Sequence, residues 1–341
     1  MMSSEFIPLV QNVWRHRIEG TSMYAVTRKL RALKPREESQ ALVQSVTREE
    51  IKDAFFDIAE DKAPGPDGYS SGFYKAAWPV IGEEMIKAIL EFFTTGRLLK
   101  QVNTTILAII RKRLRLVLDK LISPPQNAFV SGRSIGDNIL LAQELFAGYN
   151  RQGLPMRCAL KVDLRKAYDM VEWDFLSVVL QLFGFPGTFI RWVEECVTTP
   201  MFSVCINGNP HGFFKGSRGL RQGNPMSPFL FVMIMEVLQL MLLQLIDQNE
   251  GFSFHWRCKE LGLFQLCFAD DLLLFCKADV ASVQVFRNAL DEFAKLSGLH
   301  ANPQKSQLIL SVQHRMSGNN YLQHYISRRV TFPSGTLDFL F

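Results

Sequence analysis

Two adjacent aspartates, Asp270 and Asp271, lie between two short apolar runs, and this arrangement constrains the fold more than any other stretch of the sequence. The runs 266–269 and 272–276 have the length of strands and are apolar on both faces, which is typical of strands buried inside a sheet. The pattern predicts a hairpin with two carboxylates at its tip. Neighbouring ionised carboxylates need a cation or free access to water. A magnesium site and an ordinary Asp-Asp turn both meet that need, and the hairpin alone does not choose between them.

A third acid, Asp163, ends another predicted strand at 158–163, and apolar residues with helical spacing follow from Trp173. In α/β folds, ligand groups lie just outside the carboxyl ends of strands. Magnesium prefers one or two carboxylates together with substrate phosphates and water, so these acids and a basic loop containing Gly219 and Gly223 suggest phosphoryl transfer. Two metal ions about 3.5 to 4 Å apart would stabilise both the attacking and the leaving oxygen. The sequence contains no motif of the serine hydrolases, zinc proteases, P-loop enzymes or Rossmann enzymes.

The composition indicates a globular protein with a mildly basic charge. Of 341 residues, 48% are hydrophobic and 21% are charged, and the net charge is +5. This charge is compatible with a nucleic-acid partner but does not demonstrate one. The six cysteines form no C-x-x-C pair, which suggests reduced thiols in an intracellular protein. We expect no signal peptide, and Glu236 and two glutamines interrupt the longest apolar run (229–246), which predicts a buried helix of a soluble protein and not a membrane span.

Apolar periodicity, helix caps and turn residues predict the remaining elements. Thr47 and Glu50 form a capping-box pattern before one helix, and Ser227 suits the N-cap of another helix, with Pro228 as its first helical residue. The other predicted segments are a basic helix at 9–34, a helix at 82–93, a strand at 106–110, a helix at 116–122, a helix capped by Asp137 or Asn138 and continuing to Tyr149, two strands within 202–214 joined at Asn207-Gly208, a helix from 283 to Gly298, and an irregular tail from 312.

Four blocks of sequence, taken in order, resemble the palm motifs of reverse transcriptases. They are KVDLRKAYDMVEWDFL from Lys161, GLRQGNPMSP from Gly219, FADDLLLF from Phe268 and SGLHANPQKS from Ser297. The stretches KAPGPDG and QNAFVSGRSIGDNILLA are similar to those of non-LTR, LINE-type retrotransposon polymerases of the plant style. The resemblance implies an α+β fold, the right-hand polymerase palm, in which helices back an antiparallel sheet. It divides the chain into a basic N-terminal segment (1–45), partial fingers (46–157), the palm (158–311) and an irregular tail with little or no thumb (312–341).

The resemblance also implies roles for individual residues. Asp163 and Asp270 match the principal metal ligands, and Asp271 completes the triad for two Mg²⁺ ions, which Mn²⁺ could replace. Tyr168 matches the aromatic steric gate, which excludes nucleotides that carry a 2′-OH, although a core aromatic is the alternative interpretation. Gln222 and Gly223 match a loop that lies against the incoming nucleotide and template, where glycine allows close approach of the backbone. Lys305 matches the lysine that would protonate the pyrophosphate leaving group, although a solvated loop lysine is the alternative. Arg133 matches a fingers-side residue near the template. The expected partners are an RNA template, a DNA primer and deoxynucleoside triphosphates.

The sequence departs from the family pattern at several places. Asn224 and Met226 replace Asp and Leu, two changes that should leave the loop intact. Between Ile110 and Arg113 the family has further residues that build fingers strands and clamp the triphosphate, and a similar excision precedes Val46. We also expect an upstream endonuclease domain and a thumb to be missing.

Three functions therefore remain open. The first is a reverse transcriptase, weakened or inactivated by truncation, and the second is a non-catalytic relic of a retroelement that binds nucleic acid. The third is a maturase or an RNA-directed RNA polymerase on the same palm, against which FADD and Tyr168 argue. The compartment is expected to be intracellular, without a choice between nucleus and cytoplasm.

Overall fold

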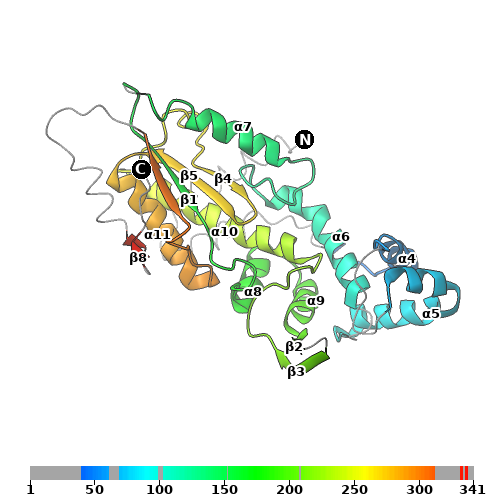
Figure 1. Cartoon of the computed structure of the whole chain (residues 1–341). Coiled ribbons are helices and arrows are strands. Elements are labelled where there is room, and N and C mark those ends of the chain that lie inside the picture. The colour runs from blue at the N-terminus through cyan, green and yellow to red at the C-terminus, as the bar shows by residue number, and fades with distance from the viewer. Residues whose placement is uncertain are drawn as a thin grey trace.

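The computed structural model of this chain combines a helical part with a part built on an antiparallel sheet (Figure 1). The structure describes residues 40–60, 69–98, 103–151, 153–206, 209–311, 331–332 and 335–336. The predicted basic helix at 9–34, the KAPGPDG loop, the Asn207-Gly208 turn and most of the predicted tail lie outside these residues.

The central sheet has four strands in the order β4-β5-β1-β6, and all neighbouring strands are antiparallel. The strands are β1 (Arg157–Val162), β4 (Gln265–Phe268), β5 (Asp271–Lys277) and β6 (Gln307–Leu310). Strands β4 and β5 form the predicted hairpin, and β1 is the strand predicted to precede Asp163. These findings confirm the predicted α+β class with an antiparallel sheet backed by helices.

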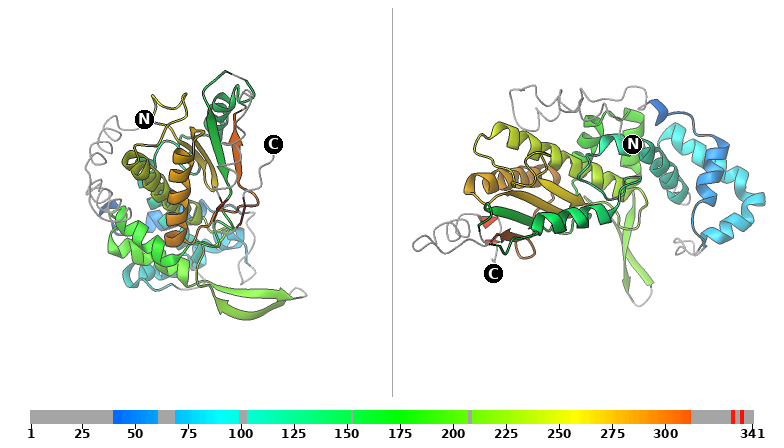
Figure 2. Two further views of the ribbon diagram at one scale, coloured as in Figure 1. Left: turned by 90° about the vertical axis from the view of Figure 1, so that its left-hand side faces the viewer. Right: turned by 90° about the horizontal axis from the view of Figure 1, so that it is seen from above.

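Both faces of the sheet are covered because side chains along a strand alternate between the two faces. Cys158 and Leu160 face the main hydrophobic core, which includes residues of α10 (Ser227–Gln248) and α11 (Val280–Ser297). Ala159 and Phe275 face a second, smaller cluster that contains Leu145 of α7 (Ile135–Phe146). Figure 2 shows α10 and α11 on one side of the sheet and α7 on the other.

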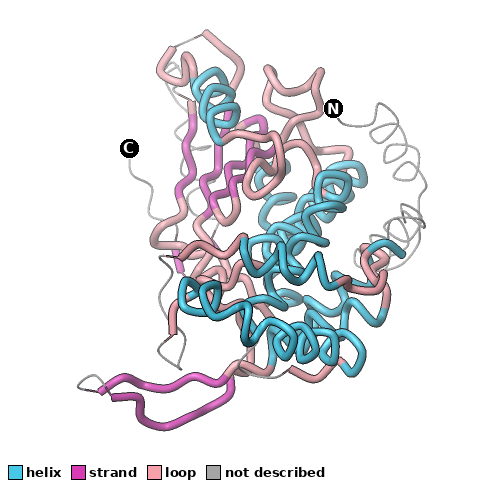
Figure 3. The backbone as a smooth tube through the Cα atoms, turned by 90° about the vertical axis from the view of Figure 1, so that its right-hand side faces the viewer, coloured by secondary structure: helices cyan, strands magenta, loops and turns pink. Residues whose placement is uncertain are grey.

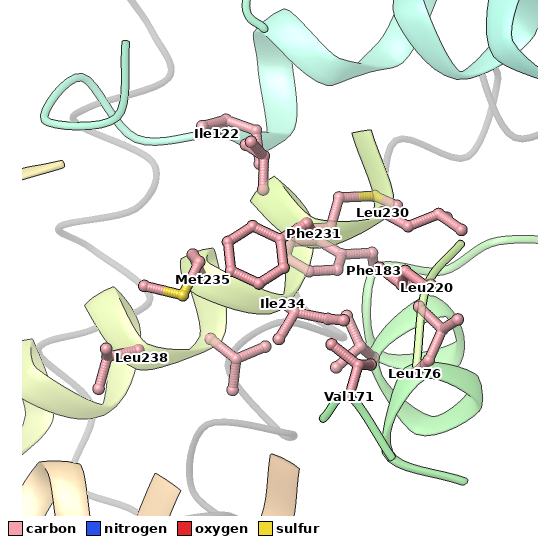
Figure 4. Packing of buried hydrophobic residues seen from close by; sticks show 14 of the residues in the cluster. Ile122, Val171, Leu176, Phe183, Leu220, Leu230, Phe231, Ile234, Met235 and Leu238 are labelled. Atoms are coloured by element: carbon pink, nitrogen blue, oxygen red, sulfur yellow. The ribbon is translucent and has the colours of Figure 1, made fainter. Parts of the chain in front are cut away.

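Helix α10 is the centre of the main core. Its residues Phe231 and Ile234 lie among Ile122, Val171 and Leu220, which come from three distant parts of the chain (Figure 4). In the described part of the chain, α10 is the one helix long and apolar enough to cross a membrane, but 83% of its apolar window is buried inside the protein. This burial matches the predicted core helix.

The remaining helices and strands surround this centre. Figure 3 shows most of the helices grouped beside the sheet and a two-stranded hairpin that projects from the body. These elements are α4 (Arg48–Phe56), α5 (Ser71–Thr95), α6 (Asn103–Leu121), α8 (Trp173–Leu182), α9 (Gly187–Thr198), β2 (Met201–Ile206), β3 (Asn209–Lys215), β7 (Thr331–Phe332) and β8 (Gly335–Thr336).

The strand predicted at 106–110 is wrong, because these residues belong to α6, which runs without interruption to Leu121. Ile106, Ile110 and Leu114 are fully buried, and their spacing places them on one side of a helix. The isoleucines favour a strand locally, but burial along the helix decides the conformation. The separate short helix predicted at 116–122 is therefore the last part of α6.

Helix caps were predicted with mixed success. Thr47 caps α4 as predicted, since its hydroxyl accepts a hydrogen bond from the amide of Glu50 at 3.1 Å. Helix α7 is capped by Ser134 and not by Asp137 or Asn138. The prediction of Ser227 as the N-cap of α10 is wrong by one residue, because Met226 is the cap and Ser227 is the first residue of the helix. Helix α9 was not predicted.

Candidate active site

The three predicted acids meet at one end of the sheet because of the pairing between β1 and β5. Val162 pairs with Leu272, so Asp163 follows β1 at the sheet end where β5 begins with Asp271. Phe268 pairs with Asp271 and leaves Ala269 and Asp270 as the turn of the hairpin. Asp163 is half-buried, whereas Asp270 and Asp271 are exposed. The predicted juxtaposition of an acid at a strand end and two acids at a hairpin tip is therefore present.

The donor set suits a hard divalent cation in its chemistry, because Mg²⁺ prefers carboxylate oxygens together with water and phosphate. The backbone brings Asp163, Asp270 and Asp271 to the same sheet end. Within the residues that the structure describes, however, no three His, Cys, Asp or Glu side chains are gathered closely enough to hold a metal ion. The strands thus place the backbone of the three aspartates at one sheet end, while their carboxylates are not gathered at ion-binding distance.

Tyr168 lies between this sheet end and α10. Its ring stacks on Phe231 with 4.7 Å between the ring centres and an interplanar angle of 17°. Burial raises the pKa of Tyr168 to about 12, and the negative charge of Asp270 adds to the shift. Tyr168 is half-buried, so it packs against the core while part of it remains accessible beside the acids.

The loop that contains Gln222 and Gly223 is fastened to the chain around Tyr168. The amide of Leu220 donates to the carbonyl of Tyr168, and the amide of Gly219 donates to Val171, both at 2.7 Å. Gly219 has φ +94°, and a Cβ there would lie 2.7 Å from the carbonyl oxygen of Asp169, so glycine is required. These contacts hold the predicted nucleotide-binding loop against the segment that carries Tyr168.

Gln222 and Gly223 themselves are exposed at the open part of this loop. Gly223 has φ +83°, and nothing lies within 4 Å of the position where its Cβ would be. The positive φ of Gly223 explains why glycine occupies this position. The close approach of a nucleotide to its backbone stays a prediction. Gln222 makes a long contact of 3.5 Å from its side-chain amide to Asp169.

Lys305 lies in a turn that is bound to the backbone of Asp163. The amide of Asn302 donates to the carbonyl of Asp163 at 2.7 Å, and the amide of Asp163 donates to the hydroxyl of Ser306 at 3.1 Å. Lys305 is exposed between these two anchors. The structure therefore brings the segment of Lys305 beside the first acid, and the role of its ammonium group stays a prediction.

Arg133 is used inside the protein. Its terminal nitrogens donate to the carbonyls of Ile122, Ser123 and Gln126 at 2.6 to 2.7 Å. Burial lowers the pKa of Arg133, and the negative charge of Glu236 opposes that shift. These bonds tie together the turn after α6, so the geometry gives Arg133 a structural task, and its predicted contact with the template stays untested.

Comparison with known proteins agrees with this geometry. The family model described as "Reverse transcriptase (RNA-dependent DNA polymerase)" matches residues 97–332. This chain belongs to the reverse transcriptase family. The match includes all of the sheet, the three acids and Tyr168. The fold is accordingly of the polymerase palm type.

Several similar proteins are named as products of the transposon TX1 or of the retrotransposable element R2, which supports a LINE-type reverse transcriptase domain. The "Transposon TX1 uncharacterized 149 kDa protein" of Xenopus laevis is 24% identical over 300 residues, which are 80% of this chain and 22% of that protein. The Pol polyprotein of element R2DM from Drosophila melanogaster is 26% identical over 208 residues, which are 61% of this chain and 18% of that protein. The reverse transcriptase domain thus spans less than a quarter of these relatives.

A solved structure described as telomerase from Candida albicans in complex with a fragment of telomeric RNA aligns with 73% of this chain and 39% of that chain. Its TM-score is 0.45 and its sequence identity is 16%.

One functional residue that the sequence did not reveal is Gln126, which holds the tip of the β4–β5 hairpin in this reverse transcriptase domain. Its side-chain oxygen accepts hydrogen bonds from the amides of Ala128 at 2.9 Å and Ala269 at 3.1 Å. Its side-chain nitrogen donates to the sulfur of Cys267 at 3.0 Å. Ala269 has φ +55°, a strained conformation for alanine, directly before Asp270. The stretch that begins at Gln126 did not reveal this role, because Cys267 and Ala269 lie more than a hundred residues away in the sequence.

A buried acid, Glu236 of α10, binds the turn after α6, which lies a few residues before Gln126. Its carboxylate accepts hydrogen bonds from the amide of Ser123 at 3.0 Å and from the Ser123 hydroxyl. Burial raises the pKa of Glu236 from its usual 4.5 to about 7, and the bonds from Ser123 and the charge of Arg133 oppose the shift. The signal in the sequence is the single acid within an apolar run, which by itself argues only against a membrane span.

We predict that Gln126→Leu loosens the hairpin tip. The substitution leaves the buried amide of Ala269 without an acceptor, a loss of about 1–3 kcal/mol or roughly 5- to 150-fold in local opening. Hydrogen exchange of a peptide covering 266–272 should accelerate, while a peptide from α11 should not. Gln181→Leu, at an exposed glutamine of α8, is the matched control. Unchanged exchange at 266–272 would show that Gln126 does not hold the tip.

We also predict that Glu236 makes the stability of the domain depend on pH. Between pH 4.5 and about 7 the native state keeps a proton on Glu236 that the unfolded chain releases, so the free energy of unfolding falls as pH rises through this window. Glu236→Gln should abolish this decrease in the free energy of unfolding, which is on the order of 1–3 kcal/mol in the wild type. Urea unfolding at pH 5 and pH 7.5 measures it, with exposed Glu250→Gln as control. Parallel pH profiles of the wild type and Glu236→Gln would contradict the assignment.

Proposed function

We propose that this domain performs RNA-templated DNA synthesis with Asp163, Asp270 and Asp271 as the metal-binding acids. The observation that supports this most strongly is the strand register, which brings three aspartates of two distant motifs to one sheet end. Two Mg²⁺ ions bound there, or Mn²⁺ in their place, would stabilise the attacking 3′ oxygen of a DNA primer and the leaving oxygen of the triphosphate.

The chain's own residues would position the substrates around these acids. The exposed loop at Gln222 and Gly223 leaves open space for the incoming deoxynucleoside triphosphate and the RNA template. Tyr168, supported from behind by Phe231, would meet the sugar at the position of a 2′-OH. Lys305, beside Asp163, would give a proton to the departing pyrophosphate.

Synthesis by this chain should be slow. Phosphoryl transfer depends on positioning and electrostatic clamping of the triphosphate more than on covalent chemistry. In the place where the family resemblance implies a fingers clamp, the residues from Ile110 to Arg113 form part of the uninterrupted helix α6. Arg113, which could otherwise serve as a clamp, is buried and pairs with Glu50 at 2.8 Å. Loss of one preorganised donor typically costs about a hundred- to a thousandfold in rate, and loss of a clamp should cost more.

Primer extension on an RNA template tests the proposal. The wild type should give slow, Mg²⁺- or Mn²⁺-dependent incorporation above the level of Asp163→Asn and Asp270→Asn, each of which should lose at least about a hundredfold because the acid contributes ligand charge. Asp174→Asn, an exposed aspartate of α8, is the control and should leave the rate unchanged. Incorporation that survives in Asp163→Asn or Asp270→Asn would disprove the site. Equal background in all proteins would favour a non-catalytic relic that binds nucleic acid.

Tyr168→Val should admit ribonucleotides. Removing the ring takes away the group that would clash with the 2′-OH, so the ratio of ribo- to deoxyribonucleotide incorporation should rise by about tenfold or more, the scale at which one group in a pocket discriminates between substrates. Tyr168→Phe keeps the ring and should keep the wild-type ratio. If Tyr168→Val also keeps that ratio, Tyr168 is a packing residue of the core and not a steric gate.

A further inference from the structure

The β2–β3 hairpin projects from the body of the protein (Figures 2 and 3). It carries two exposed aromatic rings. Phe202 and Phe214 face each other across the two strands, with ring centres 6.0 Å apart and an interplanar angle of 28°. They are 40% and 52% exposed, and Val204 on the same hairpin is 54% exposed. Large apolar side chains grouped on a projecting element indicate a binding surface.

Along the chain, the hairpin and the loop that follows it carry charges of one sign. No aspartate or glutamate occurs between Glu195 and Glu236, whereas Lys215, Arg218 and Arg221 fall within that interval. Lys215 and Arg221 are exposed. Arg218 is paired with Glu172 of the palm at 3.2 Å. A surface with exposed rings and cations, and without acids along its own chain, is complementary to a polyanion with flat bases.

The hairpin leads directly into the proposed centre. A Cβ at Gly216 would lie 3.1 Å from the ring of Phe202 and 3.6 Å from that of Trp173, so these rings enclose the base of the hairpin. The indole nitrogen of Trp173 donates to the carbonyl of Gly219 at 2.8 Å, within the loop fastened to Tyr168. Gly219 follows Phe214 by five positions, which is at most ~18 Å of extended chain. That distance corresponds to about five stacked nucleotides at ~3.4 Å each.

We propose that the β2–β3 hairpin binds single-stranded RNA, with bases stacked on Phe202 and Phe214 and phosphates bound by Lys215 and Arg221. The inference rests on the proposed function, since the strand bound here would be the template outside the primer duplex. Stacking on aromatic side chains tolerates any base, which suits an enzyme that must copy every sequence. A protein partner would match the apolar rings equally well. It would not, however, account for the absence of acids over this stretch, whereas a polyanion does.

Binding of a fluorescently labelled single-stranded RNA of about 12 nucleotides, measured by anisotropy without metal or triphosphates, tests the inference. Phe202→Ala and Phe214→Ala should each weaken binding by about tenfold, because each removes one stacking platform. Phe214→Tyr should retain wild-type affinity. Val178→Ala, at a residue 40% exposed on α8, is the control and should have no effect. Lys215→Gln should reduce the slope of log affinity against log salt by about 0.7.

Three outcomes would overturn the inference. The first is a wild type that does not bind the RNA, and the second is a set of ring variants within twofold of wild-type affinity. The third is loss of self-association in the ring variants at unchanged RNA affinity, which would point to a protein partner. Circular dichroism confirms that each variant is folded. If the ring variants bind RNA more weakly and primer extension stays at background, this inference is retained and the polymerase proposal is rejected. If the ring variants bind RNA as the wild type does and the wild type extends primers, the polymerase proposal is retained and this inference is rejected.

Discussion

The antiparallel pairing of β1 with β5 determines where every acid of the proposed centre lies. Successive residues of β1 face opposite sides of the sheet, so Cys158 and Leu160 reach the main core while Ala159 reaches the second cluster. A slip of one residue would exchange these faces and would also move Asp163 away from its place beside Asp271. The hydrophobic core and the position of the aspartates therefore depend on the same register. A shift in register that disrupts the core would also displace Asp163 from Asp271.

The segment that follows Asp163 is fixed in turn by two glycines from distant motifs. Gly219 is packed against the carbonyl of Asp169, and Gly298 ends α11 with φ +78° against the carbonyl of Met170. Both conformations and both close approaches exclude a side chain. Tyr168 is therefore positioned by backbone contacts on both sides of its segment, which is a stiffer support than side-chain packing alone.

The sequence predicted three strands of the sheet and the place of three acids at their ends, because apolar runs of strand length and the acids beside them are local signals. It failed at 106–110, where β-branched residues suggested a strand but the surrounding core selects a helix. It could not reveal the task of Gln126, whose bond to Ala269 exists only after two segments far apart in sequence have met. The sequence also did not show that the guanidinium of Arg133 donates hydrogen bonds to carbonyls of the turn after α6. The assigned roles of Tyr168, Gln222, Gly223 and Lys305 are compatible with their positions and await the kinetic tests.

The order of the strands has a consequence for synthesis on the ribosome. Strand β1 pairs on one edge with β5 and on the other with β6, and both partners follow it by more than a hundred residues. At about 5 to 20 residues per second, a newly made β1 waits roughly 5 to 20 s before either neighbour exists. During that interval its apolar residues have no sheet to join, and long-range pairing of this kind folds slowly. We therefore expect that the nascent chain depends on chaperones until residue 310 has left the exit tunnel.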